Sequence, residues 1–433
     1  MAPRISFFLG AGFAHNFIDK KNRHPLPLVT EVENLFRQEL DDFQFRCMKP
    51  DSGRSMEDVR GVLDMPPSKC PISASLLDQL KTFYGQLTGT EVAKVNIEQC
   101  IGLMYWFDNY LRRAGCTFQN YSSKEFLNNP IWGSLIQRLG PHLGSNLIRD
   151  VVDIPLSKCF PQPMFTDGNS IGNLGLCDLF EEVFRRQRQL EIFSLNWDLV
   201  IETYYKHQAK VNLCTGFVDV TEEFVKRLPK NVRISDVKAW QPSGFNSSSR
   251  NLFKLHGSLN WKSIQPYKMV GAFRYIPDYS SPNDYPSLLE IAGSATWLNW
   301  LDSEDVGRLK LGQRVFAERK ALLVGIEKEE QYLYEPYSSL ISALKTSLAA
   351  VTHLYVIGYG FGDEGMNNIL LSSFLQRVGS RSPLRMIIVS RGEDAAKGLI
   401  AKQPCLAHYA AEKAGMVTAF PGAVKDLQSR LPS

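Results

Sequence analysis

Short hydrophobic runs alternate with amphipathic helical patterns near the start of the chain and throughout its second half. Continuous apolar runs that end at a glycine or a polar residue are typical of buried parallel strands. Such runs predict strands at 5–9, 190–195, 252–255, 321–326, 354–357 and 384–389. Helical patterns follow at 198–207, 338–350 and 365–376. This alternation favours an α/β fold built on a Rossmann-like, doubly wound parallel sheet.

The stretch between the first two predicted strands has a different pattern, which is mostly helical. Thr30–Glu33 reads as a capping box at a helix start. Apolar positions at helical spacing predict helices at 91–113, 124–139 and 173–189. Residues 47–75 are rich in Pro, Ser, Asp and Gly, which predicts a long loop.

Composition limits the classes of protein to consider. The 433 residues are 44% hydrophobic with a formal charge of +4, which indicates a globular chain without the basic excess of a typical DNA-binding protein. The eight cysteines form no C-x-x-C pair, which argues against a disulfide framework or a zinc ribbon and favours free thiols in a reducing cytoplasm. No apolar run approaches the ~20 residues that span a bilayer. We therefore expect a soluble, cytoplasmic protein with no membrane partner.

Familiar motifs of metal and nucleotide chemistry are missing from the sequence. It contains no H-E-x-x-H pair, no EF-hand loop, no P-loop lysine and no G-x-S-x-G elbow. We therefore expect no bound metal, no ATP hydrolysis and no esterase activity. Residues 262–320 alternate aromatic and turn residues, and their fold cannot be assigned from the sequence.

A glycine-rich turn, Gly10-Ala11-Gly12-Phe13, directly follows the first predicted strand. Glycines at such a turn let the backbone approach a phosphate, with amide groups pointing at the anion. The third glycine of the dinucleotide fingerprint is missing, so a tight turn that needs glycine for positive φ is an equal alternative.

Polar residues with chemical potential follow two later strands. Asn196 and Asp198 come after the strand at 190–195, where the Asn amide could orient a ribose hydroxyl or a water and the Asp could serve as a helix N-cap. His256 follows the strand at 252–255 and precedes a glycine. A histidine there could act as a general base, although a structural, hydrogen-bonded histidine is the commoner case.

A second glycine-rich segment follows the strand at 354–357. Gly358, Gly360 and Gly362 alternate with aromatic residues, Asp363 comes directly after them, and Asn367 follows four residues later. The segment predicts either a loop that faces a phosphate or ribose, or a flexible glycine turn.

Taken in order, these four motifs resemble the sirtuin-like superfamily, and most closely its bacterial branch that degrades NAD in anti-phage defence. The resemblance extends from residue 5 to about 390. It implies a Rossmann-like domain that binds NAD, with Asn196 and His256 as the catalytic residues. It also implies a cofactor site made of Gly10, Ala11, Gly12 and Phe13 at the pyrophosphate, Asp198 at the nicotinamide ribose, and Gly358 and Tyr359 towards the adenosine.

The sequence departs from the family pattern at three places. Ala14 stands where the family commonly has Ser. The Gly-x-Pro-Asp-Phe-Arg stretch of the protein deacetylases is replaced by Asn-Arg-His-Pro-Leu-Pro at 22–27, and the paired C-x-x-C zinc module is missing. These departures favour hydrolysis of NAD+ to nicotinamide and ADP-ribose over protein deacylation, with no zinc expected.

The motif order also predicts the domain organisation. We expect residues 1–29 and 190–433 to form one discontinuous NAD-binding core, and 30–189 to be a mostly helical insertion. Since an uncontrolled NAD hydrolase would kill its host, the resemblance implies a homo-oligomer gated by a HerA-type ATPase partner or a phage-derived trigger. A nucleotide-binding scaffold and a nuclease subunit working with an ATPase remain alternatives, which leaves nucleic-acid binding open.

Overall fold

The computed structural model describes most of the chain and leaves several segments aside. The described residues are 3–21, 23–27, 29–47, 76–113, 152, 156, 159, 160, 168–220, 237–246, 249–269, 275–277, 288–291, 314–325, 328–413, 415–422 and 424–432. The loop predicted at 47–75 and the helix predicted at 124–139 lie almost entirely outside these ranges.

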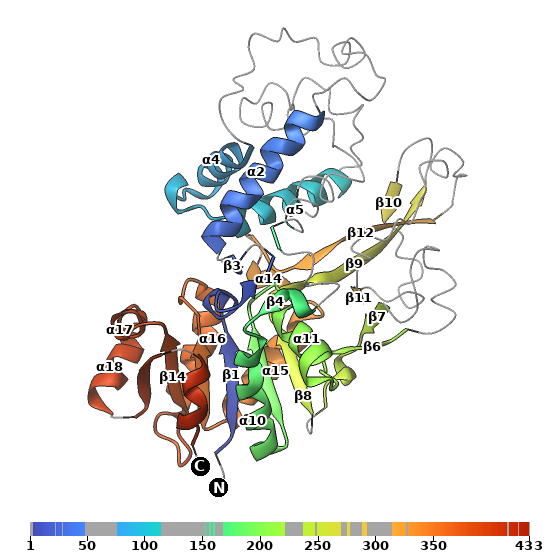
Figure 1. The fold of residues 1–433 in the computed structure, drawn as a ribbon. Helices are drawn as coiled ribbons and strands as arrows, with labels where there is room; N and C mark the ends of the chain where they lie inside the picture. The colour runs from blue at the N-terminus through green and yellow to red at the C-terminus, as the bar shows by residue number, and fades with distance from the viewer. Residues whose placement is uncertain are drawn as a thin grey trace.

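A six-stranded parallel sheet forms the centre of the fold (Figure 1). Its order is β15-β14-β13-β1-β5-β8, and every neighbouring pair is parallel. The strands are β1 Ile5–Leu9, β5 Leu190–Ser194, β8 Arg250–Lys254, β13 His353–Ile357, β14 Arg385–Ser390 and β15 Val417–Pro421. The predicted α/β class with a Rossmann-like parallel sheet is confirmed. However, the strand predicted at 384–389 is not the last strand of the sheet, because β15 follows it.

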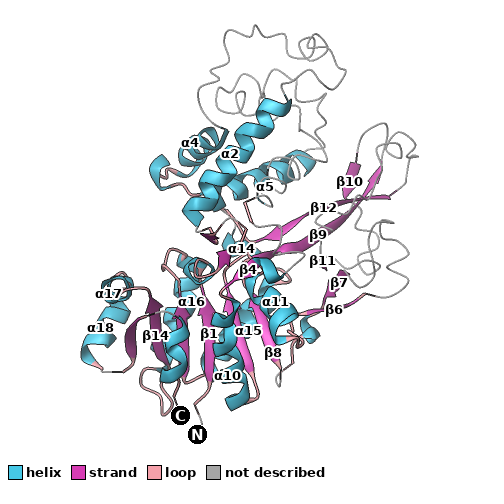
Figure 2. Cartoon of the chain, viewed as in Figure 1, coloured by secondary structure: helices cyan, strands magenta, loops and turns pink. Residues whose placement is uncertain are grey.

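Helices cover both faces of this sheet (Figure 2). Side chains of β1 alternate between the faces, so Phe7 packs edge-on against Phe180 of α10 at 4.9 Å between ring centroids, and Phe8 packs against Tyr359 at 5.2 Å. The helices around the sheet are α10 Asp178–Gln187, α15 Tyr337–Ala350, α16 Glu364–Arg377, α17 Glu393–Ala401 and α18 Pro404–Glu412. Because the strands are buried on both faces, their sequences read as continuous hydrophobic runs.

A second, antiparallel sheet includes the described strands of 262–320, the region that the sequence could not assign, together with β6 and β7 from earlier in the chain. Its order is β10-β9-β11-β7-β6, and β12 pairs with β9. The strands are β6 Phe217–Asp219, β7 Val237–Trp240, β9 Gly257–Met269, β10 Tyr275–Pro277, β11 Leu288–Ile291 and β12 Arg314–Leu322. The strand predicted at 321–326 is therefore misplaced, since β12 ends at Leu322 and begins seven residues before the predicted start.

Three helices, α2 Val29–Cys47, α4 Leu76–Thr88 and α5 Ile97–Arg113, lie beyond the carboxyl edge of the parallel sheet (Figure 1). The prediction of one helix over 91–113 is wrong at its start. Val92–Lys94 forms a short 3₁₀ turn, and α5 begins only at Ile97. The reason is local, because Asn96 and Gln99 form a reciprocal capping box with backbone-to-side-chain bonds of 2.9 and 3.0 Å.

The remaining elements are short. They are α1 Ala11–Ala14, β2 Ile18–Asp19, β3 His24–Pro25, β4 Ile171–Gly172, α11 Val200–Tyr204 and α14 Lys328–Gln331. The helix predicted at 198–207 is α11 followed by a π-helical turn at Tyr205–Ala209.

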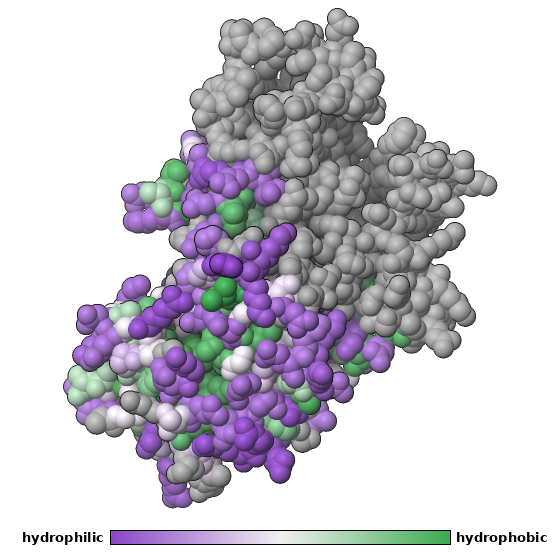
Figure 3. All heavy atoms as spheres, in the orientation of Figure 1, coloured by the Kyte–Doolittle hydropathy of each residue, from purple (hydrophilic) through white to green (hydrophobic). Residues whose placement is uncertain are grey.

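The coloured part of the face seen in Figure 3 is largely hydrophilic, with smaller hydrophobic areas between the polar side chains. None of the helices in the described ranges combines the length and the hydrophobicity that crossing a membrane requires. Cys100, Cys159 and Cys177 are buried free thiols.

Candidate functional site

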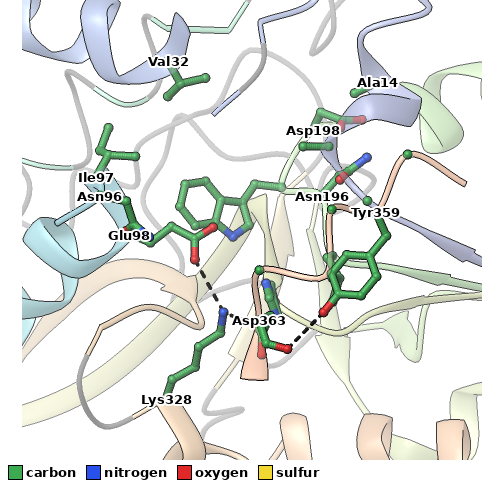
Figure 4. Close-up of a pocket in the computed structure, with 18 of the residues that line it drawn as sticks. Ala14, Val32, Asn96, Ile97, Glu98, Asn196, Asp198, Lys328, Tyr359 and Asp363 are labelled. Atoms are coloured by element: carbon green, nitrogen blue, oxygen red, sulfur yellow. Dashed lines mark hydrogen bonds and ion pairs between the residues drawn. The ribbon is translucent and has the colours of Figure 1, made fainter. Parts of the chain in front are cut away.

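A cavity of about 570 Å³ opens at the carboxyl edge of the parallel sheet (Figure 4). In open α/β sheets this edge is where ligands bind, at the point where the strand order reverses. Here the order reverses at β1, because the chain builds β5 and β8 on one side of it and β13 to β15 on the other. The cavity is lined from four strand ends and from α5, and its lining includes Gly10, Ala11, Asn96, Glu98, Asn196, Asp198, His256, Lys328, Gly358, Tyr359 and Asp363.

The two glycine-rich loops contact each other backbone to backbone. The Gly12 amide donates to the Gly358 carbonyl at 2.9 Å, and the Gly10 amide donates to the Ile357 carbonyl at 2.9 Å. A Cβ on Gly10 would lie 2.6 Å from the Tyr359 Cα, and Gly358 has a φ of +65°. Both motifs therefore need glycine for this contact as well as for any ligand. Gly10 and Ala11 line the cavity, whereas Gly12 and the buried Phe13 do not.

The turn after β5 carries Asn196 and Asp198, and both line the cavity while almost buried, with exposed fractions of 8% and 6%. Asp198 Oδ1 accepts a hydrogen bond from the Val200 amide at 3.0 Å, which fixes the turn before α11, but the N-cap residue of α11 is Leu199 and not Asp198. The Asn196 amide nitrogen of the backbone donates to Ser194 Oγ at 3.1 Å, which fixes the turn.

His256 lies in the tight turn between β8 and β9. Gly257 has a φ of +79°, and a Cβ there would lie 2.0 Å from the Ala321 carbonyl oxygen, so the turn requires glycine after the histidine. The imidazole is 3% exposed and lines the cavity. Its Nε2 lies 3.2 Å from Asp363 Oδ2. Burial and the nearby Lys328 ammonium hold the pKa of His256 below its usual value, although Asp363 acts in the opposite direction.

Asp363 is the meeting point of three groups. Its Oδ1 accepts from the Met366 amide at 2.9 Å and so caps α16. Its Oδ2 lies 2.5 Å from Lys328 Nζ, and Lys328 in turn lies 3.4 Å from Glu98 Oε2 (Figure 4). Burial alone would raise the pKa of Asp363, but His256 and Lys328 outweigh burial and hold that pKa well below its usual range.

Tyr359 and Asn367 hold the second glycine loop in place. The Tyr359 hydroxyl lies 2.8 Å from Asn367 Oδ1 and 3.0 Å from the Asp363 carbonyl oxygen. The Asn367 amide donates to the Phe361 carbonyl at 3.0 Å. Burial raises the pKa of Tyr359, so this phenol stays protonated at neutral pH. Tyr359 therefore fixes the loop as well as lining the cavity.

The sequence did not indicate the cavity residues of α5 or Lys328. Ile97, Glu98 and Gln99 come from the first turn of α5, and Asn96 directly precedes it. The capping-box spacing of Asn96 and Gln99 was a readable signal for where α5 starts, but not for its place beside the sheet. Lys328 follows β12 by a few residues and carries no motif that would mark it.

A buried ion pair lies behind the Asn196–Asp198 turn. Lys254, 2% exposed, donates from Nζ to the Asp198 carbonyl oxygen and lies 3.5 Å from Glu202 Oε1. Burial raises the pKa of Glu202 to about 7, against the opposing effect of Lys254. The pair ties β8 to α11 and supports the turn that carries Asn196 and Asp198.

The buried Lys254–Glu202 pair predicts that the stability of the protein depends on pH. Because folding raises the Glu202 pKa from 4.5 to about 7, its contribution is full below pH 4.5 and is lost as the pH rises to 7. The wild type should lose about 3 kcal/mol of unfolding free energy over that window that Glu202→Gln does not lose. Urea unfolding of both proteins at several pH values measures the difference. Exposed Glu330→Gln is the matched control, and equal curves for wild type and Glu202→Gln would contradict the prediction.

No group of three or more His, Cys, Asp or Glu side chains suited to a metal is found among the described residues.

Comparisons with known proteins place the site in a family. No curated protein matches the chain. The SIR2-like domain matches residues 190–410, from β5 through most of α18, which includes Asn196, His256 and the second glycine loop. Such domains are NAD-dependent enzymes. The match covers just over half of the chain, and the protein belongs to the SIR2-like domain family.

Proposed function

We propose that the protein is an NAD+ hydrolase that cleaves the nicotinamide–ribose bond to give nicotinamide and ADP-ribose. One observation carries the proposal: Asn196 and His256, which lie sixty residues apart in a SIR2-like domain, line the same cavity as Gly10 and Gly358. A scaffold that only binds a nucleotide needs the glycine loops but has no use for a buried amide and a buried imidazole beside them.

The proposed reaction uses few protein groups. The ribose C1–N bond breaks, and nicotinamide leaves as a neutral molecule with the bonding electrons. Water adds to the oxocarbenium-like C1, and its proton passes to His256 directly or through a ribose hydroxyl. Asn196 orients the ribose and the attacking water. A histidine whose pKa lies below the usual value is neutral at pH 7, as a general base must be.

The departures of the sequence from the family pattern favour hydrolysis of NAD+ over protein deacylation. The chain has no paired C-x-x-C zinc module, and Asn-Arg-His-Pro-Leu-Pro at 22–27 replaces the deacetylase stretch. In addition, Asn96, Glu98 and Gln99 at the start of α5 line the cavity beside the catalytic pair. These residues therefore border the space where the reacting ribose would bind.

We further propose a role in anti-phage defence by NAD depletion in the cytoplasm, which is supported by the resemblance of the four motifs to that branch of the sirtuin-like proteins. On this proposal residues 30–189 are a mostly helical insertion in a discontinuous core of 1–29 and 190–433, although α10 at the end of the insertion packs on the parallel sheet of that core. Helix α5 of the insertion supplies cavity residues, so a homo-oligomer contact, a HerA-type ATPase or a phage-derived trigger that moves this helix would alter the site.

The direct test is incubation of the purified protein with NAD+, alone and with the product of a neighbouring gene. We expect nicotinamide and ADP-ribose to appear in equal amounts, measured by chromatography. Acetylated peptide and double-stranded DNA in parallel reactions test the deacylase and nuclease alternatives. Consumption of NAD+ only when acetylated peptide is present and is deacylated, or DNA cleavage with NAD+ left intact, would overturn the proposal.

A further inference from the structure

One carboxylate oxygen at the cavity lies close to both a lysine ammonium and a histidine ring. Asp363 Oδ2 lies 2.5 Å from Lys328 Nζ and 3.2 Å from His256 Nε2. The lysine contact is a full hydrogen bond. The histidine contact lacks the alignment of one, so the buried Nε2 has no hydrogen-bond partner although it lies close to the carboxylate. In this arrangement Lys328 makes the shorter contact with Asp363, and His256 lies beside the same oxygen without an aligned hydrogen bond.

Asp363 itself is held in place. Its Oδ1 caps α16 through the Met366 amide, and its carbonyl oxygen lies 3.0 Å from the Tyr359 hydroxyl. A small rotation of the carboxylate about this anchor is enough to align Oδ2 with either neighbour. A general base is commonly oriented by such a third group, which fixes the ring and the nitrogen that carries the proton.

Lys328 is connected to the helical part of the protein. Its Nζ lies 3.4 Å from Glu98 Oε2 in the first turn of α5. A second contact fixes α5 at the same place, because Gly102 of α5 and Gly325 meet backbone to backbone. A Cβ on Gly102 would lie 2.0 Å from the Gly325 Cα, and Gly325 has a φ of +89°. Helix α5 therefore contacts Lys328 through Glu98 and contacts Gly325, three residues earlier in the chain, through Gly102.

We propose that Asp363 is the positioning residue for His256, and that Lys328, held by Glu98 on α5, competes with His256 for the same carboxylate oxygen. This inference rests on the proposed NAD hydrolysis for its catalytic meaning, but its geometry is independent of the substrate. When Lys328 moves towards Glu98, Asp363 turns to His256 Nε2 and leaves Nδ1 as the basic nitrogen. A movement of α5 would thus change the orientation of His256 through two ion pairs, Glu98–Lys328 and Lys328–Asp363.

The charged groups around His256 shift its pKa in opposite directions, so the removal of each group has a predicted direction. Lys328 lowers the His256 pKa, whereas Asp363 and Glu98 raise it. Titration of ¹⁵N-labelled histidines by NMR, with His256→Ala to assign the signal, should give a higher His256 pKa in Lys328→Met. It should give a lower pKa in Asp363→Asn and in Glu98→Gln. We expect shifts of about 1 pH unit for the two nearer groups, as is usual for a charge within 4–6 Å, and less for Glu98.

Matched controls remove a charge elsewhere. Glu330→Gln lies on α14 with Lys328 but is exposed, and Lys345→Met removes an exposed lysine of α15. Both should leave the His256 titration unchanged. A His256 pKa that stays constant in all three test variants, or that moves in the same direction in all three, would overturn the inference.

The titration separates this inference from the proposed function. It needs no NAD, so a wild type without NAD hydrolysis but with the expected His256 shifts would overturn the proposed function alone. Conversely, an active wild type with an unmoved His256 signal would overturn the positioning role of Asp363 alone. In an active protein, the acidic limb of the pH–rate profile should move with the His256 pKa in Lys328→Met.

Discussion

Replacement of His256 by alanine is expected to slow NAD hydrolysis by about 10²–10⁴-fold, the usual contribution of a general base. The imidazole is the one histidine side chain among the described residues that line the cavity. Asn196→Ala should have a loss of similar size, because the ribose and the water then lose their orienting amide. Rates of nicotinamide release, measured under activating conditions, test both variants.

The control for these substitutions is His408→Ala. His408 lies on α18 with its side chain 53% exposed, and its contacts with Tyr409 and Glu412 stay within the same helix, so its loss should not change the rate. Thermal unfolding followed by circular dichroism checks that each variant is folded. Full turnover in a folded His256→Ala protein would remove this histidine from the mechanism.

The parallel sheet could be predicted from the sequence because its strands are buried on both faces. Ile5–Leu9 is hydrophobic at four of its five positions and Leu190–Ser194 at three of five, and such runs are readable without knowing their partners. β15 could not be recognised in the same way. It lies at the edge of the sheet, alternates buried and exposed residues only in part, and ends in Pro421, which is tolerated at an edge.

The antiparallel sheet could not be predicted from the sequence, for a different reason. β9 pairs with β12 over a long ladder, but the two strands are separated by more than forty residues in the chain. Neither strand is a hydrophobic run, and no short hairpin turn links them. Their register is therefore set by tertiary contacts that a single sequence does not reveal.

Topology explains why the candidate site was predictable only in outline. Asn196, His256 and Gly358 each follow a parallel strand, so the sequence places all three at one edge of the sheet. It does not show that Asp363, after β13, reaches His256, after β8, because β1 and β5 lie between those strands. Lys328 and Glu98 approach from segments outside the parallel sheet, which no motif marks.

Gly358→Ala is expected to destabilise the protein by about 3 kcal/mol or more, since it combines backbone strain with a steric clash. Gly358 has a φ of +65°, and its Cβ would lie 2.2 Å from the Phe13 backbone nitrogen. The two loops would have to separate, which breaks the hydrogen bond from the Gly12 amide. Urea unfolding measures the loss of free energy.

Gly360→Ala provides the matched control within the same loop. A Cβ on Gly360 would meet nothing within 4 Å, and its φ lies outside the left-handed region, so its unfolding should match that of the wild type. If both alanine variants unfold at the same urea concentration as the wild type, the contact between the loops contributes no stability. If only Gly358→Ala is destabilised, the glycine of this motif is required by the fold before any ligand binds. In that case the alternating glycines of the sequence serve two separate purposes, with Gly358 joining the loops and Gly360 leaving open space at the cavity.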